Sequence, residues 1–291
     1  MNRKTVSFSQ LSMYNECHRK WYLNYVLGLS KYEVNIHLTF GSAMHSVMQS
    51  FLKKMYTTTA TEAEDMDLNS MLKDELSKEF TEAKAQMNGV NPATKEEMVE
   101  FYEDGVQILN FFKRHRGDYF NKKGYSLVGI EIPLQKDLQN NTTFKGYIDV
   151  VIKDEISNKV KIIDFKTSTN GWKDYAKKDQ NKTAQILLYK KFYSDMFNIP
   201  VDKIDVEFII LKRKLYENVD FPQKRLQKFS PASGTVSIGH TVDMLNEFIN
   251  ACFTSTGDYN TSAIYKKTDT AKKCSWCEHL GKNCSGAGKE D

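Results

Sequence analysis

Short, nearly continuous runs of apolar residues in the middle of the chain predict buried strands. FKGYIDVVI and VKIIDFKTS, which lie between residues 144 and 168, carry apolar residues on both faces. That pattern is typical of central strands covered on two sides. SLVGIEIPL precedes them and short polar turns join the three, which predicts an antiparallel meander. Residues 205–211 predict a fourth strand.

Apolar positions spaced three and four residues apart predict helices around these strands. The first helix is capped by Ser9, continues to about Leu27 and turns Cys17 inward. The second starts near Phe40 and Gly41. Further helices are predicted in the segment 57–118, around Gln185 and Tyr189, and at 241–254. Together these elements predict an α/β (α+β) fold with a mixed central sheet flanked by helices.

The same patterns divide the chain into four parts. Residues 1–56 form N-terminal helices, and residues 57–118 form a helical insertion without obvious chemistry. Residues 119–255 hold the strands and form the core, and residues 256–291 form a cysteine-bearing C-terminal region.

Composition excludes several classes of protein. The 291 residues carry a formal net charge of +4, which is too mild to prove a nucleic-acid partner. No run of 18 apolar residues occurs, and MNRKTVSFSQ lacks the apolar core of a signal peptide, so we expect no membrane span and a cytoplasmic protein. The chain also lacks a GxxxxGK[ST] phosphate loop, so it is not itself a P-loop ATPase.

Polar residues interrupt the two central strands at positions suited to metal chemistry. Asp149 stands inside the first apolar run, and Asp164 and Lys166 follow Ile162 and Ile163 in the second. Alternation along a strand places Asp164 and Lys166 on one face, and pairing of the strands would bring Asp149 to them. Two buried carboxylates suit a hard divalent cation such as Mg2+ or Mn2+. The lysine is then free to act on a water or a phosphate.

Other polar residues are open to two interpretations. His45 lies one turn from Gly41 and is either a core histidine or part of the site. Gln185 and Tyr189 share a helix face, where they either pack in the core or serve the site. Glu131, within the first strand, either assists the metal or lies on a solvated face.

Two basic stretches with aromatic residues, 168–183 and 212–228, suit a nucleic-acid backbone and its bases. The plainer alternative is a pair of solvated loops. The candidate DNA contacts are Trp172, Lys173, Tyr175, Lys177, Lys178, Lys212, Arg213 and Lys214.

The C-terminal tail carries Cys274, Cys277 and Cys284, a grouping typical of an inorganic centre. The fourth ligand is open from spacing alone. His279 would give a zinc site of the Cys3His type, whereas Cys17 would give a site with four cysteines.

Taken in order, these motifs resemble the RecB-like iron–sulfur nucleases of the PD-(D/E)XK superfamily, the type found in the AddB nuclease domain and in CRISPR-associated RecB-like exonucleases. The resemblance covers nearly the whole chain. Its motifs are SFSQLSMYNEC ending at Cys17, Gly41 with His45, Gly146 with Asp149, Asp164 with Lys166, Gln185 with Tyr189, and the cysteines 274, 277 and 284. The chain departs from the family in having His18 where proline is common and six residues between Cys277 and Cys284 where five are usual.

The resemblance implies a restriction-endonuclease-like core and a role for each motif. It makes Asp149, Asp164, His45 and the carbonyl of Phe165 ligands of Mg2+ or Mn2+. It makes Lys166, Gln185 and Tyr189 catalytic residues beside the carboxylates. It also implies a [4Fe–4S] cluster held by Cys17, Cys274, Cys277 and Cys284, with Zn2+ as the alternative, so that residues 256–291 pack back on the N-terminus.

The activity that the resemblance implies is metal-dependent hydrolysis of DNA, by an exonuclease that prefers single strands. The implied settings are recombination and repair, CRISPR spacer processing and phage DNA metabolism, with a helicase as a plausible partner. Two rival hypotheses are a non-catalytic DNA-binding subunit and a zinc-stabilised nucleic-acid adaptor. The sequence predicts no oligomeric state.

Overall fold

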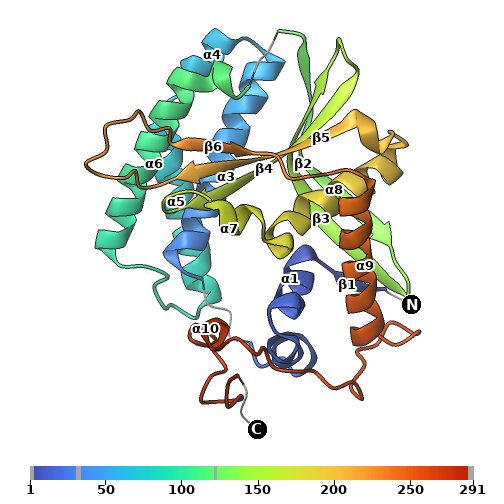
Figure 1. Ribbon diagram of the computed structural model, residues 1–291. Helices are drawn as coiled ribbons and strands as arrows, with labels where there is room; N and C mark the ends of the chain where they lie inside the picture. The colour runs from blue at the N-terminus through green and yellow to red at the C-terminus, as the bar shows by residue number, and fades with distance from the viewer. Residues whose placement is uncertain (1–2, 31–33, 121–122, 288–291) are drawn as a thin grey trace.

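The central feature is a twisted sheet of six strands between two layers of helices (Figure 1). The structure is a computed structural model, and it describes residues 3–30, 34–120 and 123–287. None of the described helices is long and apolar enough to cross a membrane. The mixed α/β architecture with helices on both faces confirms the predicted fold class.

The sheet is mixed in direction. Its strands are β1 (Lys4–Val6), β2 (Tyr125–Asp137), β3 (Thr142–Asp154), β4 (Lys159–Ser168), β5 (Ile204–Lys212) and β6 (Leu226–Phe229). β2, β3 and β4 form the predicted antiparallel meander, β5 is parallel to β4, and β6 is antiparallel to β5. β1, which is parallel to β3, and the edge strand β6 were not predicted from the sequence.

One helical layer contains α3 (Ile36–Thr57), α4 (Ala60–Glu64), α5 (Leu68–Gln86), α6 (Lys95–His115) and the short η2 (Arg116–Asp118). Val150, Ile163 and Ile209 of the sheet lie in one buried apolar cluster with α3, α5 and α6. α6 starts where the Thr94 side chain accepts from Glu97 N–H and Glu97 caps Thr94 in return. α3 starts at Ile36, earlier than predicted, because Asn35 caps its first turn.

The other layer contains α1 (Phe8–Glu16), α7 (Asp174–Lys177), α8 (Gln180–Phe197), η3 (Val201–Lys203) and α9 (Thr235–Cys252). Ile148, Ile162 and Ile210 of the sheet join a second apolar cluster with α1, α8 and α9. The two clusters bury both faces of the central strands, as their apolar sequences require.

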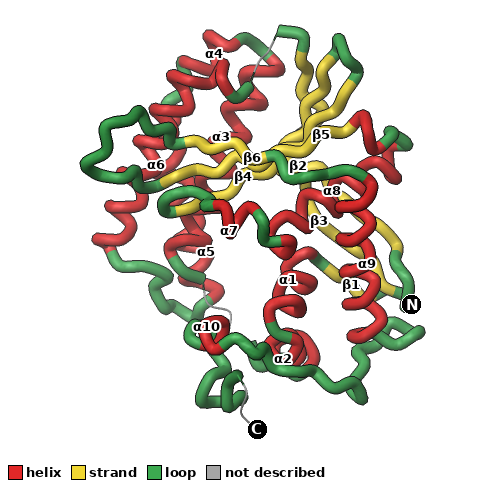
Figure 2. The backbone as a smooth tube through the Cα atoms, viewed as in Figure 1, coloured by secondary structure: helices red, strands yellow, loops and turns green. Residues whose placement is uncertain are grey.

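The N-terminal helix is broken, which corrects the prediction of one helix through Leu27. Cys17 is extended, with φ −164° and ψ 112°, and separates α1 from α2 (His18–Trp21) and the π-helical turn η1 (Tyr22–Val26). The C-terminal α10 (Ala271–Cys274) lies beside this broken segment (Figure 2). A backbone hydrogen bond of 3.0 Å from Arg19 N–H to Lys266 O joins the two ends of the chain.

The sheet opens into a fork along one edge of β3. β2 covers the other edge for nearly the whole length of the strand. On the forked edge β4 pairs with residues 150–154, and β1 pairs with residues 142–144. Between these partners β4 leaves β3 and continues beside β5 alone. The fork therefore begins at Asp149 on β3 and Asp164 on β4.

Candidate metal-binding and catalytic site

The fork brings Asp149 into contact with two groups that stabilise its charge. The Phe165 N–H donates to Asp149 Oδ2 at 2.7 Å, and Nδ1 of His45 lies 3.4 Å from the same oxygen. His45 projects from α3, so the helical layer on that side reaches the carboxylate through the open edge of β3. His45 is therefore not isolated in the core but contacts Asp149, and its role as a metal ligand stays a prediction.

Charge pairing sets the titration of both groups. Burial opposes the ionisation of Asp149, but His45, Lys166 and the Phe165 N–H together hold its pKa below the ordinary value. Burial likewise opposes the protonation of His45, yet Asp149 and Asp164 raise the pKa of His45 above 6.5. A cation at the fork therefore has to compete with a proton on His45.

Asp164 is the more buried carboxylate, with only 1% of its surface exposed. Its Oδ2 lies 2.7 Å from the ammonium nitrogen of Lys166, in the same-face arrangement that strand alternation predicts. Burial nevertheless raises the pKa of Asp164 to about 6, with Asp149 adding to the shift and Lys166 opposing it. One lysine does not fully compensate two neighbouring carboxylates, so the site favours additional positive charge.

A chain of hydrogen bonds fixes Lys166 from the opposite layer. Its ammonium group donates to Gln185 Oε1 at 2.7 Å, and Gln185 Nε2 donates to Tyr189 Oη at 3.0 Å. Both partners lie on α8, one turn apart. A Cβ at Gly146 would lie 2.8 Å from Tyr189 Cε1, so the glycine before Asp149 makes room for the tyrosine ring.

Gln49, for which the sequence predicts no role, and Glu131, for which it leaves two interpretations open, lie beside Asp149. Gln49, one turn after His45 on α3, donates to Glu131 Oε1 at 2.5 Å and lies 3.5 Å from the carbonyl oxygen of Asp149. Glu131 has φ +50°, whereas every other described non-glycine residue with positive φ is asparagine. Such backbone is unfavourable for glutamate. Glu131 is exposed but bonded to Gln49, so it is neither a simple solvated residue nor a direct contact of the carboxylates.

The donor set at the fork suits a hard divalent cation. Asp149 and Asp164 offer carboxylate oxygens, Phe165, which follows Asp164 directly, offers a backbone carbonyl, and His45 offers an imidazole, which favours Mn2+ somewhat. In the described parts of the chain, no three His, Cys, Asp or Glu side chains stand close enough to hold a metal ion as they are now placed. The chemistry of the donors therefore carries the assignment, and the Lys166 ammonium now occupies one oxygen of Asp164.

The four candidate cluster cysteines come from the two ends of the described chain, and as they are now placed no three of these described residues stand close enough together to hold a metal ion. Cys17, Cys274, Cys277 and Cys284 line one small cavity between the broken N-terminal helix and the C-terminal tail. All four are free thiols and partly exposed, whereas Cys252 is buried in the core as the last residue of α9. Soft thiolate donors fit an iron–sulfur cluster or zinc and do not fit Mg2+.

The same cavity indicates how the two candidates for the fourth ligand differ. His279 also lines it, but its Nε2 is hydrogen-bonded to the Asn24 side chain and the ring is buried. Cys17 stands at the helix break, where its sulfur accepts the Lys20 N–H at 3.4 Å. The Cys17 sulfur therefore lies at the start of α2 and on the wall of the cavity, as the alternative with four cysteines requires.

Seven of the eight candidate DNA contacts fall into three groups, and Tyr175 stands apart from them. Trp172, Lys173 and Lys212 line one pocket, and Lys177 and Lys178 line another. Tyr175 is exposed on α7. Arg213 and Lys214 form the third group, because both are paired with Asp104 of α6, at 2.9 and 3.0 Å. Arg213 is also buried and stacks on Phe101, so its predicted place on a DNA phosphate is not supported by this geometry.

Comparison with known proteins gives one strong match. The family model described as "PD-(D/E)XK nuclease superfamily" matches residues 5–281. Among solved structures, a Eubacterium rectale protein provisionally named an exonuclease is 11% identical, with a TM-score of 0.45 over 86% of this chain and 80% of that chain. The protein SSO0001 is 9% identical, with a TM-score of 0.29 over 86% of this chain and 84% of that chain. These two likenesses are too low to support an argument about activity. No curated protein matches the sequence.

Proposed function

The chain belongs to the PD-(D/E)XK nuclease superfamily, and on that basis we propose that it is a metal-dependent DNA nuclease. More specifically, we propose an exonuclease that prefers single-stranded DNA and belongs to the RecB-like iron–sulfur branch. The observation that carries the proposal is the fork itself. There Asp149 and Asp164 meet His45 from one helical layer and Lys166 with Gln185 from the other. A non-catalytic DNA-binding subunit has no need of this complete set.

In this proposal each residue at the fork has a distinct task. Asp149 and Asp164, with the Phe165 carbonyl and His45, hold Mg2+ or Mn2+. The bound cation supplies an acidified water and neutralises charge on the scissile phosphate. The hydrogen bond from the Phe165 N–H orients the Asp149 carboxylate for this task. The negative charge of Asp164 is less well neutralised by its neighbours, so a bound cation would stabilise its ionised form most.

Lys166 acts beside the reacting phosphate. Its ammonium group, fixed by Asp164 and Gln185, can orient the attacking water or donate to the phosphate oxygen on which charge grows. Burial raises the pKa of Tyr189 to about 12, so this residue stays a neutral hydroxyl that orients Gln185. Gln185 and Tyr189 therefore serve by holding the lysine in place.

The DNA strand would follow the basic surface that flanks the fork. Lys173 and Lys212 lie on one part of it, Lys177 and Lys178 on another, and Trp172 and Tyr175 offer aromatic surface. Each lysine that neutralises a phosphate makes binding more salt-dependent. Arg213 and Lys214 are left out of this path because Asp104 and Glu100 already pair with them.

We further propose that Cys17, Cys274, Cys277 and Cys284 hold a [4Fe–4S] cluster with a structural role. The cavity that they line lies between the two ends of the described chain. A cross-link between residues so far apart in sequence removes more conformational entropy from the unfolded chain than a local one does. Zn2+ bound to the same thiolates is the alternative. Recombination and repair, CRISPR spacer processing and phage DNA metabolism are the proposed settings. A helicase is a candidate partner, since the chain has no phosphate loop of its own.

The test is cleavage of end-labelled DNA by protein prepared without oxygen. Linear and circular forms of single- and double-stranded DNA are incubated with Mg2+, Mn2+ or EDTA, with Asp149→Asn as the inactive control. The proposal predicts cleavage that requires metal, is lost in the variant and spares circles. Binding without turnover under every metal would favour the non-catalytic subunit, and cleavage of circles would make the protein an endonuclease.

A further inference from the structure

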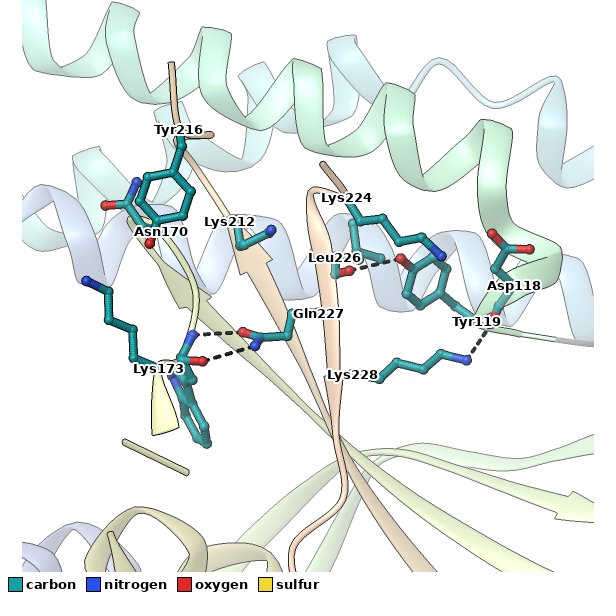
Figure 3. Close-up of a pocket in the computed structure, with 11 residues that line it drawn as sticks. Asp118, Tyr119, Asn170, Lys173, Lys212, Tyr216, Lys224, Leu226, Gln227 and Lys228 are labelled. Atoms are coloured by element: carbon teal, nitrogen blue, oxygen red, sulfur yellow. Dashed lines mark hydrogen bonds between the residues drawn. The ribbon is translucent and has the colours of Figure 1, made fainter. Parts of the chain in front are cut away.

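A pocket of about 490 Å³ lies at the edge of the sheet, where β6 and two loops meet (Figure 3). Lys212 stands in its middle, with Lys173, Asn170 and Tyr216 on one side and Lys224, Lys228 and Tyr119 on the other. None of the proposed metal ligands lines this pocket. Its size is within the range of sites that hold a small organic molecule.

Strand register relates this pocket to Lys166. Lys166 is paired with Ile210, and Ile210 is paired with Gln227 of β6. Lys212 follows Ile210 by two residues and is paired with Ser168, so its side chain leaves the same face of the sheet as that of Lys166. From strand geometry, the Cα atoms of Lys166 and Lys212 are about 8 Å apart. The pocket is thus about one nucleotide away from the fork.

In the described chain, three lysines of the pocket lack an acidic partner, although the Asp118 carboxylate, which pairs with His115, also lines the pocket. Within residues 3–30, 34–120 and 123–287, no carboxylate forms an ion pair with Lys173, Lys212 or Lys224. The neighbouring Arg213 and Lys214, by contrast, are paired with Asp104. Lys212 is also partly buried, and burial together with Arg225 lowers its pKa. A pocket that concentrates unpaired ammonium groups favours an anion.

Hydrogen bonds hold the walls of the pocket in place. The Gln227 side chain accepts the Trp172 N–H at 2.8 Å and donates to the Trp172 carbonyl at 3.0 Å, and Tyr119 Oη donates to the Leu226 carbonyl at 2.9 Å (Figure 3). Gly171 has φ +92°, and a Cβ there would lie 2.8 Å from both Gln227 Oε1 and Lys212 Cδ. Only glycine lets this loop approach so closely, so the pocket is pre-formed.

We propose that this pocket binds the phosphorylated end of a single DNA strand, and so recognises a terminal phosphate together with its nucleoside. This deepens the proposed nuclease function and rests on it. A terminal phosphate carries about −1.5 to −2 charges at pH 7, whereas an internal phosphodiester carries one, so three unpaired lysines match the end better. The exposed ring of Tyr216 offers a surface on which the terminal base can stack.

Binding in EDTA tests the assignment without any need for cleavage. The probes are short, internally labelled single strands with a 5′-phosphate, a 3′-phosphate or neither, and the readout is fluorescence anisotropy. We expect one of the two phosphorylated strands to bind wild type about tenfold more tightly than the unphosphorylated strand. Which end it is gives the polarity of the enzyme.

The variants separate the pocket from general charge effects. Lys212→Ala removes the central ammonium group, and Gly171→Ala crowds it without changing charge, so both should reduce the preference to less than about twofold. Lys78→Ala, which removes an exposed lysine of α5 that pairs with Glu75, should leave the preference intact. A preference that survives both pocket variants, or its absence in wild type, would overturn the assignment.

A free deoxynucleoside monophosphate distinguishes the strand end from a site for loose nucleotides. If dAMP binds to the pocket while phosphorylated strands show no advantage, the assignment to a strand end is wrong. Failure of the nuclease proposal looks different. In that case no metal supports cleavage, yet the preference for phosphorylated strands in EDTA can still be present and depend on Lys212.

Discussion

The Asp149 carboxylate accepts the backbone N–H of Phe165 at 2.7 Å, across the point where their two strands part. Past Val150 and Ile163 the ladder between β3 and β4 ends, so the Phe165 N–H has no partner on β3. The Asp149 side chain takes that place and is held against β4 as a result. Without Asp149 the buried Phe165 N–H would have no hydrogen-bond partner. The Asp149 side chain therefore links the two strands where they part, and this bond also orients its carboxylate at the proposed metal site.

Asp164→Asn is expected to stabilise the metal-free protein at about pH 8 and to abolish cleavage. The pKa of Asp164 is about 6 in the folded protein, above its ordinary value of 3.8. As pH rises between these values the folded state keeps a proton that the unfolded chain has lost, so stability falls and stays lower above pH 6. Removing the charge should raise the free energy of unfolding at pH 8 by on the order of 2 kcal/mol, measured by denaturant unfolding in EDTA.

The same measurement at about pH 4 is the control, because Asp164 is then neutral in the folded protein and the variant should gain little. Asp202→Asn, an exposed residue of η3, should change stability at neither pH. A stability gain of equal size at both pH values would contradict the assigned cause.

Gly146→Ala is expected to slow cleavage by displacing Tyr189. A Cβ at this position would lie 2.8 Å from the tyrosine ring, and the ring supports Gln185, which supports Lys166. We expect a fall in kcat of about tenfold or more with little change in KM, because the effect reaches the reacting phosphate only through Lys166.

Tyr189→Phe provides the matching test, since it removes the hydroxyl without moving the ring. If both changes act through Gln185, the double variant should be little slower than the slower single variant. Strictly additive losses would show that Gly146 acts by another route.

Glu131→Gly is expected to be more stable than Glu131→Ala by about 1 kcal/mol. Both variants lose the hydrogen bond from Gln49, but only glycine relieves the positive φ of +50°. Gln135, an exposed residue on the same strand whose φ is not positive, is the control, and there alanine should be more stable than glycine. If alanine were more stable than glycine at position 131 as well as at position 135, Glu131 would not be strained.

Cys277→Ser is expected to remove the brown colour and iron content and to destabilise the protein by about 2 kcal/mol or more, measured by thermal unfolding. The physical reason is loss of the proposed cluster, which cross-links the two ends of the chain. Cys252→Ser is the control for colour and iron content, because Cys252 is the buried last residue of α9 and does not line the cavity. Iron absent from wild type and replaced by stoichiometric zinc would favour the zinc alternative.

Local pattern was enough to predict the central strands and the same-face placement of Asp164 and Lys166. Alternation and apolar runs depend on neighbouring residues alone, and the structure follows them. The break at Cys17 was missed because the spacing of apolar residues continues through it, whereas the hydrogen bond from Arg19 to the distant Lys266 just after the break cannot be read from a local pattern. β1 and β6 were missed because short edge strands carry little pattern of their own.

The composition of the site was predicted more fully than its geometry. The motifs named His45, Gln185 and Tyr189, but only the parting of β3 and β4 explains how side chains from two helical layers meet. Arg213 was assigned to DNA because it lies in a basic stretch. Its partner, Asp104, is more than a hundred residues away in sequence, so no local pattern could indicate that its charge was already paired.

Single-turnover cleavage of a linear, end-labelled single strand by wild type and Lys166→Ala, each with saturating Mn2+, tests the central claim most directly. Lys166 contacts Asp164 and Gln185 at the fork, and the account requires it for chemistry rather than for binding. The predicted result is a fall in rate of about a hundredfold or more, with DNA affinity and Mn2+ binding nearly unchanged. Cleavage by Lys166→Ala at the wild-type rate would contradict the claim that the fork is the active site.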